Sequence, residues 1–281
     1  MRRAAMTSSN FRSWPLFLVL GVISMPLVIM YVYLFVDTVT DTTAGSLIPD
    51  RFTLHHWRFL WEEPETGRVS IWTVTLNTFI FAICTTLINV SASVTAGYAL
   101  SRLNMPFKRF FLGGILTLHA FPTITLIISI FLILQMIGLY NTLIGVILVK
   151  TALELPFGIW IMKGFFDNVP WEIEMAGLQD GASRFTVWWK LVLPQVQPGV
   201  AALAVFVFLS AWSEFILPQV LAPSGSAQVL STYLSNLIFD DIKPDFNMFK
   251  SVGVFYALPV IVVYLIFNKQ LMNIYGGGTK G

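Results

Sequence analysis

Six long apolar runs dominate this sequence and limit what the chain can fold into. A helix needs roughly 20 mostly apolar residues to cross the hydrocarbon core of a bilayer. Such runs occupy residues 14–36, 71–100, 110–137, 143–166, 200–221 and 252–267 with a short extension. They are too long and too uniformly apolar for the tilted strands of a membrane barrel. We therefore predict an all-α integral membrane protein with six transmembrane helices.

The charge content excludes most soluble functions. Only 11% of the 281 residues are charged, whereas an ordinary soluble domain has roughly 25%. A net charge of +2 without a basic tract argues against nucleic-acid binding. The single cysteine, Cys84, excludes an intrachain disulfide framework. The sequence therefore predicts a chain that is solvated by the lipid bilayer.

Basic residues are unevenly distributed over the predicted loops. One side has eleven Lys and Arg against four acidic residues, and the other has five against nine. The positive-inside rule then places both termini in the cytoplasm. We predict one transmembrane domain, 1–281, with an N-terminal segment 1–13, outer loops 37–70 and 218–250, and a cytoplasmic loop 167–199.

The cytoplasmic loop begins with the signals of a short helix. Pro170 suits the first turn of a helix, where its missing N–H costs nothing. Glu172 and Glu174 follow in that turn, where the helix dipole favours negative charge. Asp180 and Gly181 predict the end of the helix, with Gly181 in a left-handed C-cap conformation.

A second helix is predicted after this turn. Ser183 can cap a helix over residues 184–191, which Pro194 then ends. The pair of helices is either an amphipathic connector on the lipid headgroups or a docking element for a cytosolic protein. Anionic headgroups repel an acidic first helix, so docking is favoured.

This loop resembles the EAA loop of the membrane subunits of bacterial ATP-binding-cassette (ABC) importers. The family pattern is Glu-Ala-Ala, three residues, Gly, nine residues and Ile-x-Leu-Pro. The positions that match this pattern, with Leu191 in the isoleucine place, are Ala176, Gly181, Leu193 and Pro194. The Asp-Gly-Ala run that is usual around the glycine is present as Asp180, Gly181 and Ala182. Met175 stands in the glutamate place and Gly177 in the second alanine place. Glu174, one residue earlier, is a candidate to supply the missing carboxylate.

Four other segments are similar to the carbohydrate-type, maltose-transporter-like subunits of this family, namely residues 47–53, 155–166, 212–215 and 278–281. The resemblance implies a permease subunit in the bacterial cytoplasmic (inner) membrane that translocates a sugar or sugar-like solute. It also implies a second membrane permease subunit, two cytosolic ATPase subunits and an extracytoplasmic solute-binding protein. ATP and Mg²⁺ belong to the ATPases on this interpretation.

The chain itself lacks the sequence signals of a catalyst. It has no G-x-x-x-x-G-K-[ST] phosphate loop. His55 and His56 are adjacent, which is poor spacing for metal ligands. We therefore expect no catalytic residues, no metal site and no cofactor in this chain.

Ionisable residues inside predicted spans are costly and often functional. Lys150 and Glu154 are four residues apart, so they share a helix face and can neutralise one another. They are either a structural pair that faces another helix or a polar lining of the substrate path. Glu214 is either a partner for a donor on a neighbouring subunit or part of a gate. His119 is either a hydrogen-bonded core histidine at a kink or, like Gln135, part of a translocation path.

Two other functions remain open from the sequence. A secondary carrier would need its own ion-coupling carboxylates and inverted repeats. An ABC permease for a non-sugar solute would share the cytoplasmic loop.

Overall fold

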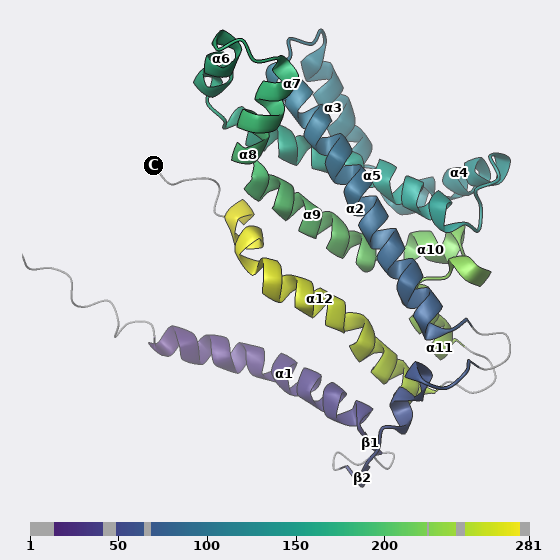
Figure 1. Ribbon diagram of the computed structural model, residues 1–281. Coiled ribbons are helices and arrows are strands. Elements are labelled where there is room, and N and C mark those ends of the chain that lie inside the picture. The colour runs from purple at the N-terminus through teal and green to yellow at the C-terminus, as the bar shows by residue number, and fades with distance from the viewer. Residues whose placement is uncertain (1–13, 42–48, 65–68, 224, 240–244, 276–281) are drawn as a thin grey trace, which may run out of the picture.

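The computed structural model describes residues 14–41, 49–64, 69–223, 225–239 and 245–275. Side chains at 116, 118 and 269–275 are not described. Within these ranges the chain is almost entirely helical, with one small hairpin (Figure 1). Its elements are α1 (Trp14–Thr38), β1 (Thr40–Asp41), β2 (Arg51–Phe52), the 3-10 helix η1 (His55–Leu60), α2 (Ile71–Arg102), α3 (Lys108–His119), α4 (Thr123–Met136), α5 (Leu143–Asp167), α6 (Trp171–Gln179), α7 (Arg184–Val187), the π-helical turn η2 (Trp188–Val192), α8 (Leu193–Gln195), α9 (Gln197–Trp212), α10 (Ile216–Leu221), the 3-10 turn η3 (Gly225–Ala227), α11 (Leu230–Ile238) and α12 (Phe246–Tyr275).

Four helices of the described ranges are long and apolar enough to cross a membrane. They are α1, α2, α5 and the Phe246–Asn268 part of α12. A fifth span results if Arg184–Gln195 and Gln197–Trp212, which are bent by 73°, count as one. The runs predicted at 14–36, 71–100 and 143–166 are thus continuous helices. The predicted segment 1–13 and the C-terminal tail lie outside the described residues.

The third predicted span, 110–137, is wrong as a single helix. The chain breaks at residues 120–122, between α3 and α4. Pro122 lacks an amide hydrogen and holds an extended conformation at the start of α4. Its ring also disfavours helical geometry at Phe121. Each resulting helix, with 12 and 14 residues, is too short to cross the hydrocarbon core alone.

The fifth predicted span, 200–221, is also interrupted. Helix α9 ends at Trp212, and α10 begins at Ile216, after three intervening residues. The Trp212 indole donates to the Tyr256 carbonyl at 3.1 Å, and the Tyr256 hydroxyl donates to the Trp212 carbonyl at 2.7 Å. These reciprocal bonds fix the end of α9 to α12. The predicted outer loop 218–250 is largely helical, because it contains part of α10, α11 and the start of α12.

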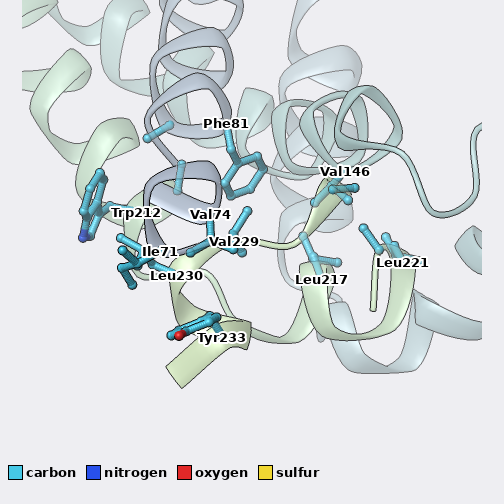
Figure 2. Packing of buried hydrophobic residues seen from close by; sticks show 14 of the residues in the cluster. Ile71, Val74, Phe81, Val146, Trp212, Leu217, Leu221, Val229, Leu230 and Tyr233 are labelled. Atoms are coloured by element: carbon cyan, nitrogen blue, oxygen red, sulfur yellow. The ribbon is translucent and has the colours of Figure 1, made fainter. Parts of the chain in front are cut away.

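Two apolar clusters lie at opposite ends of the α2, α5 and α9 bundle. The hairpin-end cluster joins the first turns of α2 to α10, α11 and the end of α9, with Phe81, Trp212, Leu217 and Leu230 fully buried (Figure 2). The loop-end cluster joins α5 and α9 to the segment from α7 to α8. Because one continuous α5 passes between them, it connects the two ends of the bundle (Figure 1).

Two glycines let α2 and α5 approach closely. A Cβ at Gly97 of α2 would lie 2.8 Å from Met162 Cβ of α5. A Cβ at Gly158 of α5 would lie 2.6 Å from the Asn89 side-chain oxygen and 2.3 Å from Ser93 Oγ. Small residues at such contacts allow two membrane helices to pack backbone against backbone.

Ion pairs fasten the hairpin end of the molecule. Lys250 of α12 pairs with Asp37 at the end of α1. Arg58 of η1 pairs with Asp245, just before α12, at 2.6 Å. Partial burial alone would raise the pKa of Asp245, but the hydrogen bond from the Met248 amide and the Arg58 guanidinium outweigh it and hold the pKa below 3.8. α1 packs mainly on α12, and none of the residues in its most apolar stretch is buried.

Candidate functional site

The loop between α5 and α9 forms a helix, a sharp turn and a second helix, as predicted. Pro170 immediately precedes α6, and Gly181 has a φ of +84°. Ser183 caps α7 by accepting a hydrogen bond from the Thr186 amide at 3.2 Å. The left-handed turn at Gly181 and the Ser183 cap are therefore confirmed.

The second helix continues past its predicted end. It extends from α7 through the wide π-helical turn η2 into α8, which ends at Gln195. Pro194 lies inside this helix, so the prediction that Pro194 ends it is wrong. The wider turn before Pro194 accommodates a ring that lacks an N–H and would crowd the carbonyl four residues earlier. The chain then bends by 73° into α9.

Four residues spaced as one helical face are exposed on α6: Glu172, Met175, Ala176 and Gln179. Asp180, which follows, is also exposed. The opposite side packs on the second helix, where a Cβ at Gly177 would lie only 2.6 Å from Leu191 Cδ1. Glycine in the second alanine place therefore permits a close contact inside the loop. Of the remaining predicted loop residues, Ala182 and Leu193 are half-buried and Pro194 is exposed.

Glu174 is not on the exposed face of α6. It is 5% exposed, and its Oε1 accepts a hydrogen bond from the Tyr98 hydroxyl of α2 at 2.8 Å. Its Oε2 lies 3.4 Å from Nε of Arg102. The expectation that Glu174 replaces the missing docking carboxylate at Met175 is therefore contradicted, since this carboxylate is engaged within its own chain.

Arg102, in the last turn of α2, is the centre of this contact. Its guanidinium donates to the carbonyls of Phe166 at 3.0 Å and Val169 at 2.5 Å. It also lies 4.8 Å from the centre of the Trp171 ring. We call Tyr98, Arg102 and Glu174 the α2 latch, because they fasten the start of α6 to α2. In the sequence, Arg102 counted only as one of the basic residues in a cytoplasmic loop. Its position at the end of an apolar helix was the one signal that it could have a structural role.

A second polar cluster lies in the middle of the bundle. Lys150 Nζ is 2.9 Å from Glu154 Oε1, so the predicted pair on α5 is confirmed. The same ammonium lies 2.7 Å from Glu214 Oε2 and donates to Ser210 Oγ at 3.0 Å. Glu214 therefore has a partner in this chain, which neither of the two predicted roles, contact with a neighbouring subunit or a gate, had included. Glu214 follows the end of α9, where the helix is interrupted before α10.

This cluster borders a cavity of about 160 Å³. The cavity lies where both helix breaks face α5, and its lining residues are His119, Phe121, Thr123, Lys150, Leu153, Glu154, Glu214 and Leu217. His119 is exposed rather than part of the core, and its ring stacks on Phe157 at a centroid distance of 5.8 Å. Gln135 is exposed on α4 and does not line the cavity.

Several characterised permeases are similar in sequence to this chain. The trehalose transport system permease protein SugB of Mycobacterium tuberculosis is 29% identical over 247 residues, covering 87% of each chain. The diacetylchitobiose uptake system permease protein NgcG of Streptomyces coelicolor is 29% identical, covering 84% of this chain and 79% of its own.

Solved transporter structures share the fold. One is a bacterial alginate ABC transporter in complex with alginate pentasaccharide-bound periplasmic protein. A chain of that structure matches this chain with a TM-score of 0.68 and 16% sequence identity, and the match covers 94% of this chain and 96% of that chain. In the MetNI methionine ABC transporter the TM-score is 0.55, with coverage of 72% and 93%. The model of the family described as "binding-protein-dependent transport system inner membrane component" matches residues 89–274. The chain therefore belongs to this family of inner membrane transport components.

Proposed function

We propose that this chain is the membrane-spanning permease subunit of an ABC importer for a sugar or sugar-like solute. The observation that carries the proposal is the loop from α6 to α8, which is fastened to the spans on one side and exposed on the other. The relatives named for trehalose and diacetylchitobiose transport support the class of solute.

The exposed side of this loop suits the docking of a cytosolic ATPase. Met175 and Ala176 on α6 are exposed, and Phe185 and Trp189 on the second helix are 69% and 56% exposed. Aromatic residues are enriched at the centres of protein interfaces. Because the α2 latch ties the buried side of α6 to α2 and α5, displacement of α6 by the ATPase moves those helices with it. The ATPases bind ATP and Mg²⁺ in this assembly, and this chain does not hydrolyse ATP.

The membrane arrangement follows from the same assignment. α3 and α4 together form one broken span, which gives six spans with both termini and the loop 167–199 in the cytoplasm. The excess of Lys and Arg on that side supports this orientation. A second permease subunit, two ATPases and an extracytoplasmic solute-binding protein complete the importer.

Reconstitution tests this function. The chain is co-expressed with the second permease subunit and the ATPase that co-purify with it, and the complex is placed in proteoliposomes with its binding protein. We expect uptake of labelled sugar only when ATP and the ATPase are present on the loop side. Uptake driven by an ion gradient without the ATPase would identify a secondary carrier instead.

Gly181→Val tests the loop within the same assay. A β-branched residue is strained at the left-handed φ of Gly181, so the second helix is re-aimed and ATP hydrolysis is uncoupled from uptake. Gly113→Val is the matched control, because a Cβ at Gly113 meets nothing within 4 Å. Equal uptake by both variants and by wild type would contradict the proposal that the loop docks the ATPase.

A further inference from the structure

One ammonium group is shared by two carboxylates that belong to different parts of the fold. Lys150 Nζ lies 2.9 Å from Glu154 Oε1, one turn further along α5. It also lies 2.7 Å from Glu214 Oε2, in the break between α9 and α10. The first contact is local, because both residues are on one continuous helix. The second contact joins two separate segments, so only the second depends on how α5 is placed against the break.

The segment that carries Glu214 is fixed to the hairpin end of the molecule. The indole of Trp212 and the hydroxyl of Tyr256 each donate to the carbonyl of the other residue, which ties this segment to α12. The Glu214 carbonyl accepts a hydrogen bond from the Ser231 hydroxyl of α11 at 2.7 Å. Its Oε1 accepts from the Leu217 amide in the first turn of α10 at 3.2 Å. Glu214 is therefore bound to α10, α11 and α12 by contacts that do not involve α5.

Helix α5 is held at both of its ends. The Asn141 amide, just before α5, donates to the Leu221 carbonyl at the end of α10 at 2.8 Å, and Val146 is buried in the hairpin-end cluster. At the other end, the α2 latch holds the Phe166 carbonyl. A displacement of α6 would therefore tilt α5 about its first turns. Lys150 is the first charged residue of α5 beyond those turns, so the tilt changes its distance from Glu214.

The presence of two carboxylates lets Lys150 leave one of them. Separating a buried ammonium from its only partner leaves an uncompensated charge, which is strongly unfavourable. Lys150 instead keeps Glu154 when it leaves Glu214. Glu214 keeps the Leu217 amide, and its side chain is 17% exposed and lines the cavity, where water can solvate it. Ser210, the third partner of the ammonium, is uncharged, so separation from it leaves no unpaired charge.

We propose that the ion pair between Lys150 and Glu214, which we call the α5 lock, closes the solute path at the hairpin end and separates when that end opens. The inference rests on the proposed function, because it links the ATP-driven movement of the loop to one contact in this chain. The two glutamates then have opposite roles. Glu214 stabilises the closed state, whereas Glu154 stabilises the open state by keeping a partner for the ammonium.

Two chemically identical substitutions test the α5 lock in the assembled importer. Glu214→Gln weakens the contact that is released, so ATP hydrolysis without solute and binding protein should rise about ten- to a hundredfold. Glu154→Gln leaves Glu214 as the one carboxylate beside the ammonium, so opening strands a charge. Hydrolysis stimulated by solute should then fall by a similar factor, with no rise in its absence. Glu63→Gln, an exposed change at the hairpin end, is the matched control and should alter neither rate.

A purely structural cluster would be weakened in the same way by either loss. A change in the same direction in both variants, or unchanged hydrolysis in Glu214→Gln, would therefore overturn the α5 lock. A wild-type complex whose ATP hydrolysis is stimulated by no solute would count against the proposed function itself.

Cross-linking measures the separation without reference to these rates. In a chain carrying Cys84→Ser, Lys150→Cys with Glu214→Cys is treated with dibromobimane, a short thiol cross-linker. We expect efficient cross-linking in the nucleotide-free complex and little in the complex arrested with ATP and vanadate. Lys150→Cys with Glu154→Cys, one turn apart on α5, should cross-link equally in both states. Equal cross-linking of Lys150→Cys with Glu214→Cys in both states would overturn the α5 lock and leave the proposed function intact.

Discussion

Arg102→Met tests the α2 latch directly. The substitution keeps an unbranched side chain of similar length but removes the guanidinium that contacts Glu174, Phe166 and Val169. Glu174 is then left 5% exposed without a cationic neighbour, and Tyr98 is its hydrogen-bond donor. The expected consequence is local opening of α6, because only opening returns the carboxylate to water.

The structure allows the size of this effect to be worked out. Removing one member of a buried ion pair costs about 3–5 kcal/mol, since the other charge stays buried without compensation. A cost of that size accelerates hydrogen exchange of the α6 amides by roughly a hundredfold to several thousandfold, at about tenfold per 1.4 kcal/mol. Hydrogen–deuterium exchange of the purified complex, followed over residues 171–179, measures it. Substrate-stimulated ATP hydrolysis should fall in parallel, because α6 is no longer fixed to the spans.

A double-mutant cycle separates the latch from general destabilisation. Glu174→Met alone should also accelerate exchange, whereas Arg102→Met with Glu174→Met should cost far less than the sum, because no unpaired charge is left buried. Lys190→Met, an exposed change in the same loop, is the control and should stay within about 0.5 kcal/mol of wild type. Strictly additive single effects, or normal exchange in Arg102→Met, would refute the reasoning.

The remaining predictions concern packing, pH and topology. Gly97→Ala should destabilise the purified chain by about 1–3 kcal/mol in thermal unfolding, because its Cβ would clash with α5, while Gly164→Ala, with nothing within 4 Å, should not. Asp245→Asn should lower the stability of the hairpin end at neutral pH. Since the folded pKa of Asp245 is lowered, this contribution is present above the unfolded value near 3.8 and is lost as the pH falls through the folded pKa. In a chain without the native cysteine, Gln179→Cys should react with impermeant maleimide only from the cytoplasm and Ser226→Cys only from outside; the reverse would overturn the orientation.

Local sequence signals predicted the parts of this fold that depend on neighbouring residues. The turn at Gly181 follows from the freedom of glycine at positive φ, and the Ser183 cap follows from a hydroxyl placed before an apolar run. The pair Lys150 and Glu154 follows from the spacing of one helical turn. Each of these needs no knowledge of the tertiary structure.

The misjudged features depend on contacts between distant segments. A hydropathy window averages over the break at residues 120–122, so it predicted one span where the structure has α3 and α4. Glu174 was a candidate docking carboxylate because its partners, Tyr98 and Arg102, are more than 70 residues earlier in the chain. The pairing of Glu214 with Lys150 was not predicted for the same reason, since the two residues are 64 positions apart.

The two polar sites lie along one helix, which gives a physical route between them. Lys150 and Glu154 lie in the middle of α5, while Phe166, whose carbonyl the α2 latch holds, lies near its end. Glu154 and Phe166 are about 18 Å apart along an unbroken α-helix. Gly97 and Gly158 pack α5 tightly on α2, so α5 cannot bend away independently of α2. We expect a displacement imposed on α6 to reach the cavity as movement of the paired α2 and α5 helices against the breaks before α4 and α10, where the helices are interrupted. The side of the cavity formed by Phe121 and Glu214 should then change shape, whereas Lys150 and Glu154, which lie on one helix, should keep their mutual geometry.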